Sequence, residues 1–204
     1  MCGRFSLTDP LRLPRAFPQY RFPEFSETRL PRFNIAPTQR VLGVRNDGKR
    51  VAELLKWGVA QRINIRSESL AARRSPIRRR CIQFADGFYE WRARRPVYYT
   101  LRSGEPFAFA GTWEPQDGSA DCDIVTCVPN ALVAEVHDRM PVILPREALD
   151  VWLDPEPLPP EVAASILKPY DARLMTARGV SRRVNSAIYD APDVLDPEPV
   201  PERG

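Results

Sequence analysis

Histidine, lysine and long apolar runs are scarce in this 204-residue chain. Each scarcity reduces the classes of protein and the kinds of site that the chain can form. No apolar run approaches the roughly 18 residues that a membrane-spanning helix requires. The first residues do not combine a charged segment with a following apolar one, so we expect no secretory signal peptide. Without such a signal, the four cysteines are expected to be reduced thiols. These absences favour a cytoplasmic protein with no membrane partner.

Several common catalytic and metal-binding motifs are also missing. The chain has no glycine-rich phosphate loop and no Gly-x-Ser-x-Gly nucleophile turn. A metal site would have to combine the single histidine, His137, with Cys81, Cys122 and Cys127. Their spacing is not that of a zinc knuckle, and two of the cysteines fall in or beside an expected strand. We therefore expect no metal and no other cofactor.

The length and the pattern of short apolar segments predict one α+β domain. We expect a mostly antiparallel, barrel-like β core with peripheral helices over residues 1–190, followed by a loose, acidic and proline-rich tail at 191–204. The expected hairpins join 40–45 to 50–57 and 97–102 to 107–114, and further strands are expected at 123–128 and 173–177. Short helices are expected near 9–17, 130–136, 145–153 and 160–168.

Positive charge is concentrated in the middle of the chain. Residues 61–102 contain eleven arginines against three acidic residues, whereas the whole chain carries a net charge of only +4. Aromatic residues lie in or beside this segment, and arginine forms forked contacts with phosphate and stacks on bases. The combination favours a groove for single-stranded nucleic acid. Codon usage in a GC-rich genome is an alternative origin of the arginine excess, but it does not explain the clustering.

A cysteine stands directly after the initiator methionine. Removal of Met1 would leave Cys2 with a free α-amine next to its thiol, and both groups titrate at about pH 8–8.5. Such a pair captures an aldehyde first as a Schiff base and then as a five-membered thiazolidine ring, whose closure is favoured by proximity. Proton transfer in this reaction needs an acid–base group, and Glu90 and His137 are the available pair. Each also has an ordinary alternative, as a surface acid on a strand and as a structural histidine.

Eight short motifs, in order over about 185 residues, resemble the SOS-response-associated peptidase (SRAP) family, whose members shield abasic sites in single-stranded DNA. The motifs are MCGRF (1–5), FNIAPTQ (33–39), KWG (56–58), INIRSE (63–68), DGFYEW (86–91), FAGTWE (109–114), HDRMPVIL (137–144) and VN (184–185). The resemblance implies a barrel-like β core with peripheral helices and a positively charged DNA groove. It also implies that Cys2, once Met1 is removed, forms a stable thiazolidine crosslink with the ring-opened aldehyde of an abasic site.

The same resemblance assigns roles to individual residues. It implies that Asn64 orients the Cys2 end and the opened sugar, and that Glu90 is the acid–base group, which also helps to release Met1 autocatalytically. His137 would assist Schiff-base chemistry and ring opening, with possible strand cleavage as a lyase step. Phosphates would be held by Arg4, Arg66 and Arg139, and the groove would be lined or its bases supported by Asn34, Pro37, Trp57 and Trp91. The expected partner is abasic single-stranded DNA, bound by a monomer.

The chain departs from the family pattern in three places. The segment from Gly58 to Asn64 is shorter than usual and lacks a Pro-x-Trp element, which affects the expected shape of the groove. Ile65 replaces a small alanine, and Gln83-Phe84 replaces a Val-Pro pair. None of these changes touches the four expected catalytic residues.

Two other functions remain open from the sequence. A class II glutamine amidotransferase also begins Met-Cys-Gly, but it needs an Asn-Gly step for its oxyanion site, and none of the five asparagines here precedes glycine. A non-catalytic module would use only the basic groove and would bind intact and abasic strands alike, reversibly and with steep salt dependence.

Overall fold

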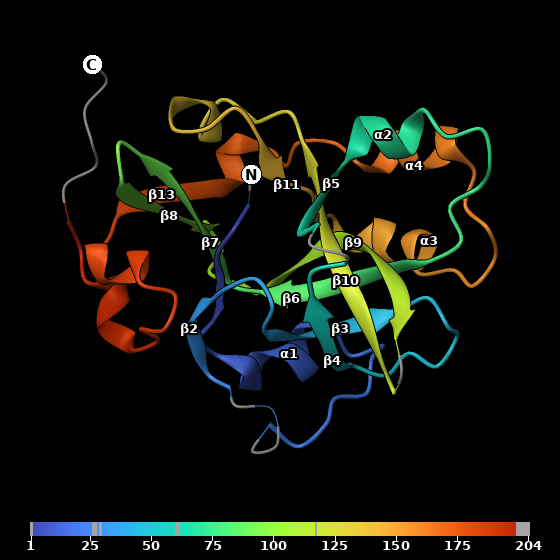
Figure 1. The fold of residues 1–204 in the computed structure, drawn as a ribbon, viewed down its shortest axis with the longest axis horizontal. Coiled ribbons are helices and arrows are strands. Elements are labelled where there is room, and N and C mark those ends of the chain that lie inside the picture. Colours follow the sequence, from blue (N-terminus) through green and yellow to red (C-terminus); the bar gives the residue numbers. More distant parts are fainter. Residues whose placement is uncertain (1, 26–27, 29, 60–61, 117, 199–204) are drawn as a thin grey trace.

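The computed structural model describes the chain except for residues 1, 26–27, 29, 60–61, 117 and 199–204. Within the described residues the strands form two sheets, and short helices lie around their edges (Figure 1). No helix in this part of the chain is long and apolar enough to cross a membrane.

The larger sheet closes into a five-stranded barrel. Its strands are β3 (Arg40–Arg45), β4 (Glu53–Trp57), β6 (Arg80–Ala85), β9 (Phe107–Gln116) and β10 (Ser119–Cys127). The pairings β10–β4, β4–β3, β3–β6, β6–β9 and β9–β10 complete the ring, and only β10–β4 among them is parallel. Short strands β5 (Asn64–Arg66), β11 (Met140–Pro141) and β12 (Ile143–Leu144) extend it along β10 and β9. The closed ring confirms the expected barrel-like core.

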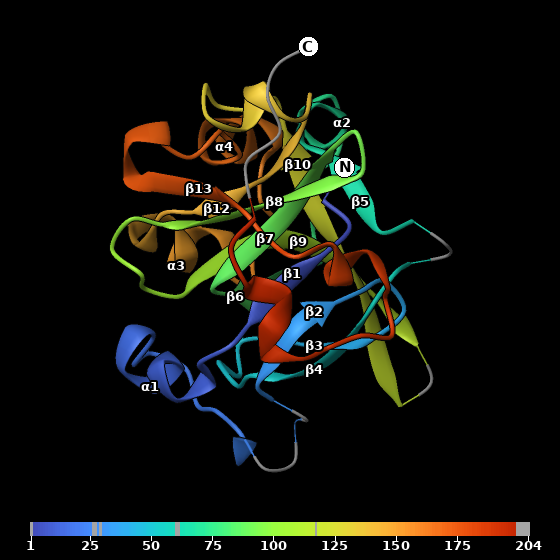
Figure 2. The ribbon, with the colours of Figure 1, turned by 90° about the vertical axis from the view of Figure 1, so that its left-hand side faces the viewer.

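The second sheet carries the N-terminus. Its order is β13-β8-β7-β1-β2, built from β1 (Phe5–Leu7), β2 (Arg32–Ile35), β7 (Gly87–Arg92), β8 (Arg95–Leu101) and β13 (Met175–Gly179). Figure 2 views the molecule from the side of this sheet. Strand β1 pairs with both β2 and β7, so the first residues of the chain enter the middle of the fold.

One hydrophobic core joins the two sheets. Phe5 of β1 packs against Trp57 of β4 and Phe109 of β9, with ring centroids 5.2 and 5.5 Å apart. All three side chains are fully buried, as expected where two sheets pack face to face. Gln83 and Phe84 are also fully buried, so this departure from the family pattern changes the packing of the core and not the surface.

The helices are short and peripheral. They are η1 (Pro10–Arg12), α1 (Leu13–Ala16), α2 (Ser67–Ala71), η3 (Val133–Glu135), η4 (Arg146–Ala148), α3 (Leu149–Trp152), α4 (Pro160–Ile166), η5 (Ala172–Leu174), η6 (Arg182–Asn185) and η7 (Pro192–Leu195). Asn130 caps the turn at η3 by accepting a hydrogen bond from the amide of Val133 at 2.9 Å. The four helical regions expected from the sequence are therefore present, the one after Asn130 as a single 3₁₀ turn.

One of the two expected hairpins is wrong. The 40–45/50–57 hairpin is present as β3–β4, but 97–102 and 107–114 do not pair with each other. Strand β8 joins the second sheet and β9 joins the barrel, so the turn at 103–106 connects two sheets instead of two neighbouring strands.

The expectation of a loose C-terminal tail is wrong for its first residues. Val194 in η7 is fully buried, and the preceding Asp190 accepts hydrogen bonds from the amides of Phe33 and Asn34 at 2.6 and 2.8 Å. Helices η6 and η7, red in Figure 1, contact β8 and β2. The acidic, proline-rich composition of the tail gave no indication that a few apolar residues, such as Val194, would be buried. Residues 199–204 lie outside the described part of the chain.

Candidate functional site

Cys2 lies between the two sheets, immediately before β1. The pairing of Phe5 with Phe88, followed by a hydrogen bond from the Tyr89 amide to the Arg4 carbonyl, brings Cys2 to the level of Glu90 on β7. Asn64, at the start of β5, donates from Nδ2 to the Cys2 carbonyl oxygen at 2.9 Å. The N-terminal cysteine is thus fixed by its backbone, and its side chain is fully buried.

Glu90 is a buried carboxyl group beside this cysteine. It is 2% exposed, and burial raises its pKa from the ordinary 4.5 to about 7, with the Asp138 carboxylate acting in the same direction. A carboxyl group with a pKa near neutrality both donates and accepts protons at physiological pH. Glu90 has the property that an acid–base group requires.

His137 faces Glu90 from the loop after η3. Its Nε2 lies 3.8 Å from Glu90 Oε2, and its Nδ1 accepts a hydrogen bond from the Arg139 amide at 3.0 Å. Asp138 Oδ1 also lies 3.0 Å from Nδ1, but that carboxylate is 88% exposed, so the backbone amide is the fixed partner. Burial lowers the pKa of His137, which favours a neutral ring with its proton on Nε2, toward Glu90.

The Cys2 thiol is held in its protonated form. Burial and the nearby Glu90 carboxylate together raise its pKa well above the ordinary value. A thiol in this state is a poor first nucleophile at neutral pH. Its reaction needs a neighbouring group that removes the proton; in the structure the thiol donates a long contact of 3.9 Å to the Arg4 carbonyl oxygen.

Several polar atoms at this site are buried without a hydrogen-bond partner. Among the described residues they include Asn64 Oδ1, Glu90 Oε1 and Arg139 Nε. Buried polar groups are nearly always satisfied, and leaving one unsatisfied costs about 1–3 kcal/mol. Such atoms gathered beside a nucleophile indicate a place where a polar ligand completes the site.

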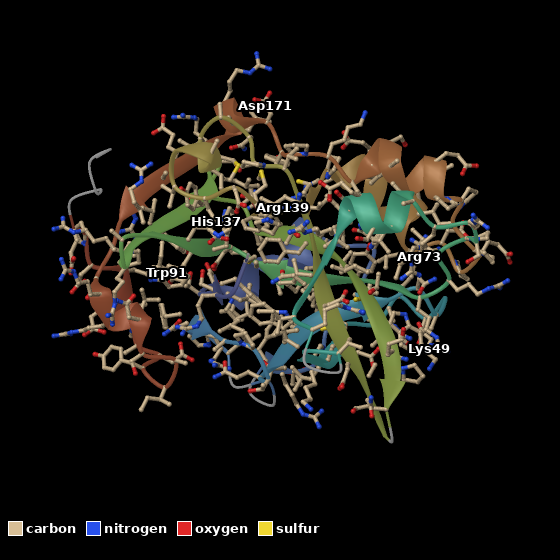
Figure 3. All side chains as sticks on the ribbon, turned by 45° about the horizontal axis from the view of Figure 1, so that its top comes forward. Lys49, Arg73, Trp91, His137, Arg139 and Asp171 are labelled. Carbon is tan, nitrogen blue, oxygen red and sulfur yellow. The ribbon has the colours of Figure 1, made fainter. Side chains whose placement is uncertain are left out.

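A hollow of about 440 Å³ opens next to the N-terminus, lined by Gly3, Arg4, Trp91, Arg94 and Asn185. The Arg4 guanidinium lies 5.9 Å from the Trp91 ring centroid, and Trp91 Nε1 donates to Asn185 Oδ1 at 2.6 Å. Figure 3 shows Trp91 and His137 in the same part of the molecule. An aromatic ring with arginines around it is suited to a base and its phosphate.

Two lining residues, Arg94 and Asn185, were not assigned a role from the sequence. Arg94 stands in the β7–β8 turn, where Ala93 and Arg94 have positive φ angles of 48° and 64°. Asn185 comes from η6, almost one hundred residues later. The Val-Asn motif was a signal for Asn185, but only the tertiary fold brings it to Trp91.

Other expected DNA contacts are buried by the structure. Asn34 is fully buried and donates to the carbonyl oxygens of Val184, Ser186 and Tyr189. Trp57 is fully buried and donates to the Ile63 carbonyl at 2.9 Å. Both side chains therefore stabilise the protein interior and do not line a surface that DNA could contact. Pro37 is partly exposed and Arg66 is exposed.

Arg139 is engaged inside the protein as well. Its side chain is 11% exposed, and its two terminal nitrogens donate to both carboxylate oxygens of Glu68 at 2.7 and 2.8 Å. It also donates to the Thr126 carbonyl at 2.7 Å. In this state Arg139 holds α2 against the His137 loop and offers little surface to a phosphate.

The arginines of residues 61–102 do not form one groove. Arg80 is fully buried, and Arg79 pairs with Glu114. In Figure 3, Arg73 lies toward the opposite end of the molecule from Trp91. The charge of this segment is therefore not gathered in one place; part of it, including Arg66 and Arg94, lies on strands or turns near the site, and a basic groove for nucleic acid stays a prediction.

The structure offers no alternative centre of comparable chemistry among its described residues. No group of three or more histidine, cysteine, aspartate or glutamate side chains there is arranged to hold a metal ion. A larger hollow of about 670 Å³ lies beside β9, β12 and α4 and is lined by none of the candidate site residues. In the described part of the chain, the candidate reactive groups converge at Cys2.

The fold and the site define a class of protein: a closed β barrel with a second sheet that holds an N-terminal cysteine beside a buried carboxyl group, an imidazole and an asparagine. The chain belongs to the SOS response associated peptidase (SRAP) family, whose model matches residues 1–187.

Curated relatives agree with this assignment, and a solved structure shares the fold. The chain is 36% identical over 225 residues to a Bacillus subtilis protein named abasic site processing protein YoqW, covering 96% of this chain and 99% of that one. It is 28% identical to abasic site processing protein YedK of Escherichia coli, covering 97% and 100%. A crystal structure of a Bacteroides thetaiotaomicron protein superposes with a TM-score of 0.81 at 21% identity, over 97% of this chain and all of that one, which shows the shared fold.

Proposed function

We propose that this protein binds single-stranded DNA at abasic sites and captures the lesion covalently through Cys2 once Met1 is removed. The observation that carries the proposal is the convergence of the partly exposed Asn64 and His137 on the buried Cys2 and Glu90. The names of its relatives support the same substrate. We further propose that it acts as a monomer in the cytoplasm without a cofactor.

The chemistry follows from the protonation states at the site. The free amine of Cys2 attacks the aldehyde of the opened abasic sugar, and loss of water gives an imine. The thiol then adds to the imine carbon, its proton passes to the imine nitrogen through Glu90, and a thiazolidine ring results. The raised pKa of the thiol makes the amine the first nucleophile. His137, which holds its Nε2 proton toward Glu90, assists sugar-ring opening.

The DNA strand would lie over the hollow beside the N-terminus. Arg4 and Trp91 are placed there for a phosphate and a base, and Pro37 and Arg66 extend the accessible surface. Asn64 would hold the Cys2 carbonyl with Nδ2, and its buried, unpartnered Oδ1 is free to accept a hydrogen bond from the opened sugar.

We also propose that the protein removes its own Met1. The step is hydrolysis of the Met1–Cys2 amide, in which water is consumed and Glu90 supplies and takes up the proton. The thiazolidine crosslink of this proposal is stable, and His137 and Glu90 are the groups that would carry a lyase step on the same lesion.

The test is a crosslinking assay with an untagged N-terminus. Protein and a single-stranded oligonucleotide with one abasic site are incubated and run on a denaturing gel, beside an intact oligonucleotide. We expect a heat-stable shifted band that requires both the lesion and Cys2. Cys2→Ser should abolish it, whereas Cys127→Ser, which changes another buried cysteine, should retain it. Equal, salt-sensitive binding of both strands on a native gel with no covalent band would overturn the proposal in favour of a binding module.

A further inference from the structure

The shortened segment between Gly58 and Asn64 has its own anchoring. Strand β10 pairs in parallel with two successive strands: Asp121 and Cys122 with the end of β4, and Ile124, Val125 and Thr126 with β5. The chain leaves β10 at Gly58, whose amide donates to the Cys122 carbonyl at 2.7 Å. It returns at Ile63, whose carbonyl accepts from the Ile124 amide at 3.1 Å. Asp123 lies on β10 between the residues that pair with β4 and those that pair with β5.

Asp123 holds the returning chain by an ion pair. Its side chain is fully buried, Arg62 Nε donates to its Oδ2 at 2.8 Å, and a terminal nitrogen of Arg62 lies 2.7 Å from the same oxygen. The other oxygen, Oδ1, accepts from the amide and the hydroxyl of Thr112 at 3.1 and 2.7 Å. With Arg62 on Oδ2 and Thr112 on Oδ1, both carboxylate oxygens have partners, and the charged pair has a defined geometry. Arg62 is 45% exposed on its other side.

We propose that the Arg62–Asp123 pair fixes the register of β5 on β10 and thereby positions Asn64 against Cys2. β5 has only three residues, and side chains alternate between faces along a strand. A slip of one residue would turn Asn64 away and remove its hydrogen bond to the Cys2 carbonyl. Arg62 and Asp123 are positioning residues, because neither contacts Cys2 and both act through Asn64.

The functional part of this inference rests on the proposed crosslinking reaction, but its structural part does not. The chain has five asparagines, so selective isotope labelling of asparagine gives few side-chain amide signals. An Asn64→Asp variant identifies the Nδ2 signal by its disappearance. That signal reports the hydrogen bond to Cys2 whether or not the protein reacts with DNA.

The test compares Arg62→Ala/Asp123→Asn with the unchanged protein. The double substitution removes the pair without leaving a buried charge, which protects folding. We expect the Asn64 amide signal to shift and the crosslinking rate to fall about tenfold to a hundredfold, the scale expected for a misplaced reacting group. Arg62→Lys, which keeps a cation, should restore part of the rate. The triple variant, with Asn64→Ala added to the double substitution, should crosslink at the same rate as Asn64→Ala alone, because both changes act through Asn64.

The control is a second arginine–carboxylate pair of the barrel, Arg79–Glu114. Arg79 is 49% exposed and Arg62 is 45% exposed, whereas Glu114 is 47% exposed and Asp123 is buried; this pair links the residue before β6 to β9 and does not hold β5. Arg79→Ala/Glu114→Gln should leave both the signal and the rate unchanged. An unchanged Asn64 signal in the Arg62/Asp123 variant would overturn the positioning role, even if the rate fell. Failure of the unchanged protein to crosslink would overturn the proposed function, and the signal would still decide the positioning.

Discussion

Replacing Glu90 by glutamine should make the protein more stable at neutral and alkaline pH while it abolishes activity. Glu90 is 2% exposed, and burial raises its pKa from 4.5 to about 7. The folded state therefore holds this proton over a pH range in which the unfolded state has lost it. Stability from Glu90 is complete below about pH 4.5 and is lost as the pH rises through about 7.

The size of the effect follows from the two pKa values. At about 1.4 kcal/mol for each pH unit, the difference between 4.5 and about 7 corresponds to about 3 kcal/mol. Glutamine stays uncharged at every pH, so Glu90→Gln should raise the free energy of unfolding by about 3 kcal/mol at pH 8 and by little at pH 4.5. A buried carboxylate that is needed for activity lowers the stability of the protein, so removing its charge is expected to raise stability and to lower activity.

The assay is urea unfolding of both proteins at several pH values between 4.5 and 8, with the N-terminal residue of each checked by mass spectrometry. Glu114→Gln, which changes a carboxylate that is 47% exposed, is the control and should give no pH-dependent gain. A Glu90→Gln protein whose advantage is the same at pH 4.5 and pH 8 would refute the raised pKa, and with it the acid–base role.

Three further outcomes are expected. Crosslinking should slow as the pH falls from 8 to 5, because the Cys2 amine and Glu90 both become protonated, and a flat rate would count against attack by the amine. Arg80→Met should lower the free energy of unfolding by at least about 3 kcal/mol in urea titrations, since the buried guanidinium donates to four backbone carbonyl groups. Glu68→Gln should cost less than about 1 kcal/mol at pH 7, because Glu68 is 53% exposed. The Arg139 pair lowers the pKa of Glu68 to about 2, so this loss should disappear between pH 4.5 and 2 in acid titrations.

The residues that meet at the site could be predicted from the sequence because they stand in short motifs. The position of Cys2 directly after the initiator methionine is set by the sequence and does not depend on the fold. The motifs around Asn64, Glu90 and His137 named the partners, and the structure brings all of them to Cys2. Strands and turns such as β3–β4 were also predictable, since alternation and an Asp-Gly turn are local signals.

Only the tertiary structure decided which residues are accessible. Trp57 and Asn34 stand in family motifs, and the sequence placed both of them at the DNA groove. Both are buried, because β1 packs over Trp57 and η6 packs over Asn34. The pairing of β8 and β9 with different sheets could not be read from the turn between them, because a turn does not specify its partners. Net charge likewise does not record which arginines are paired or buried.

The pKa of Glu90 shows the division most clearly. The sequence by itself determined that a carboxyl group, an imidazole and an N-terminal cysteine exist in this chain, and it linked them to one family. It did not determine that the carboxyl group would be 2% exposed and would titrate near neutrality. That property comes from desolvation by segments far apart in the sequence, and desolvation exists only after the chain has folded.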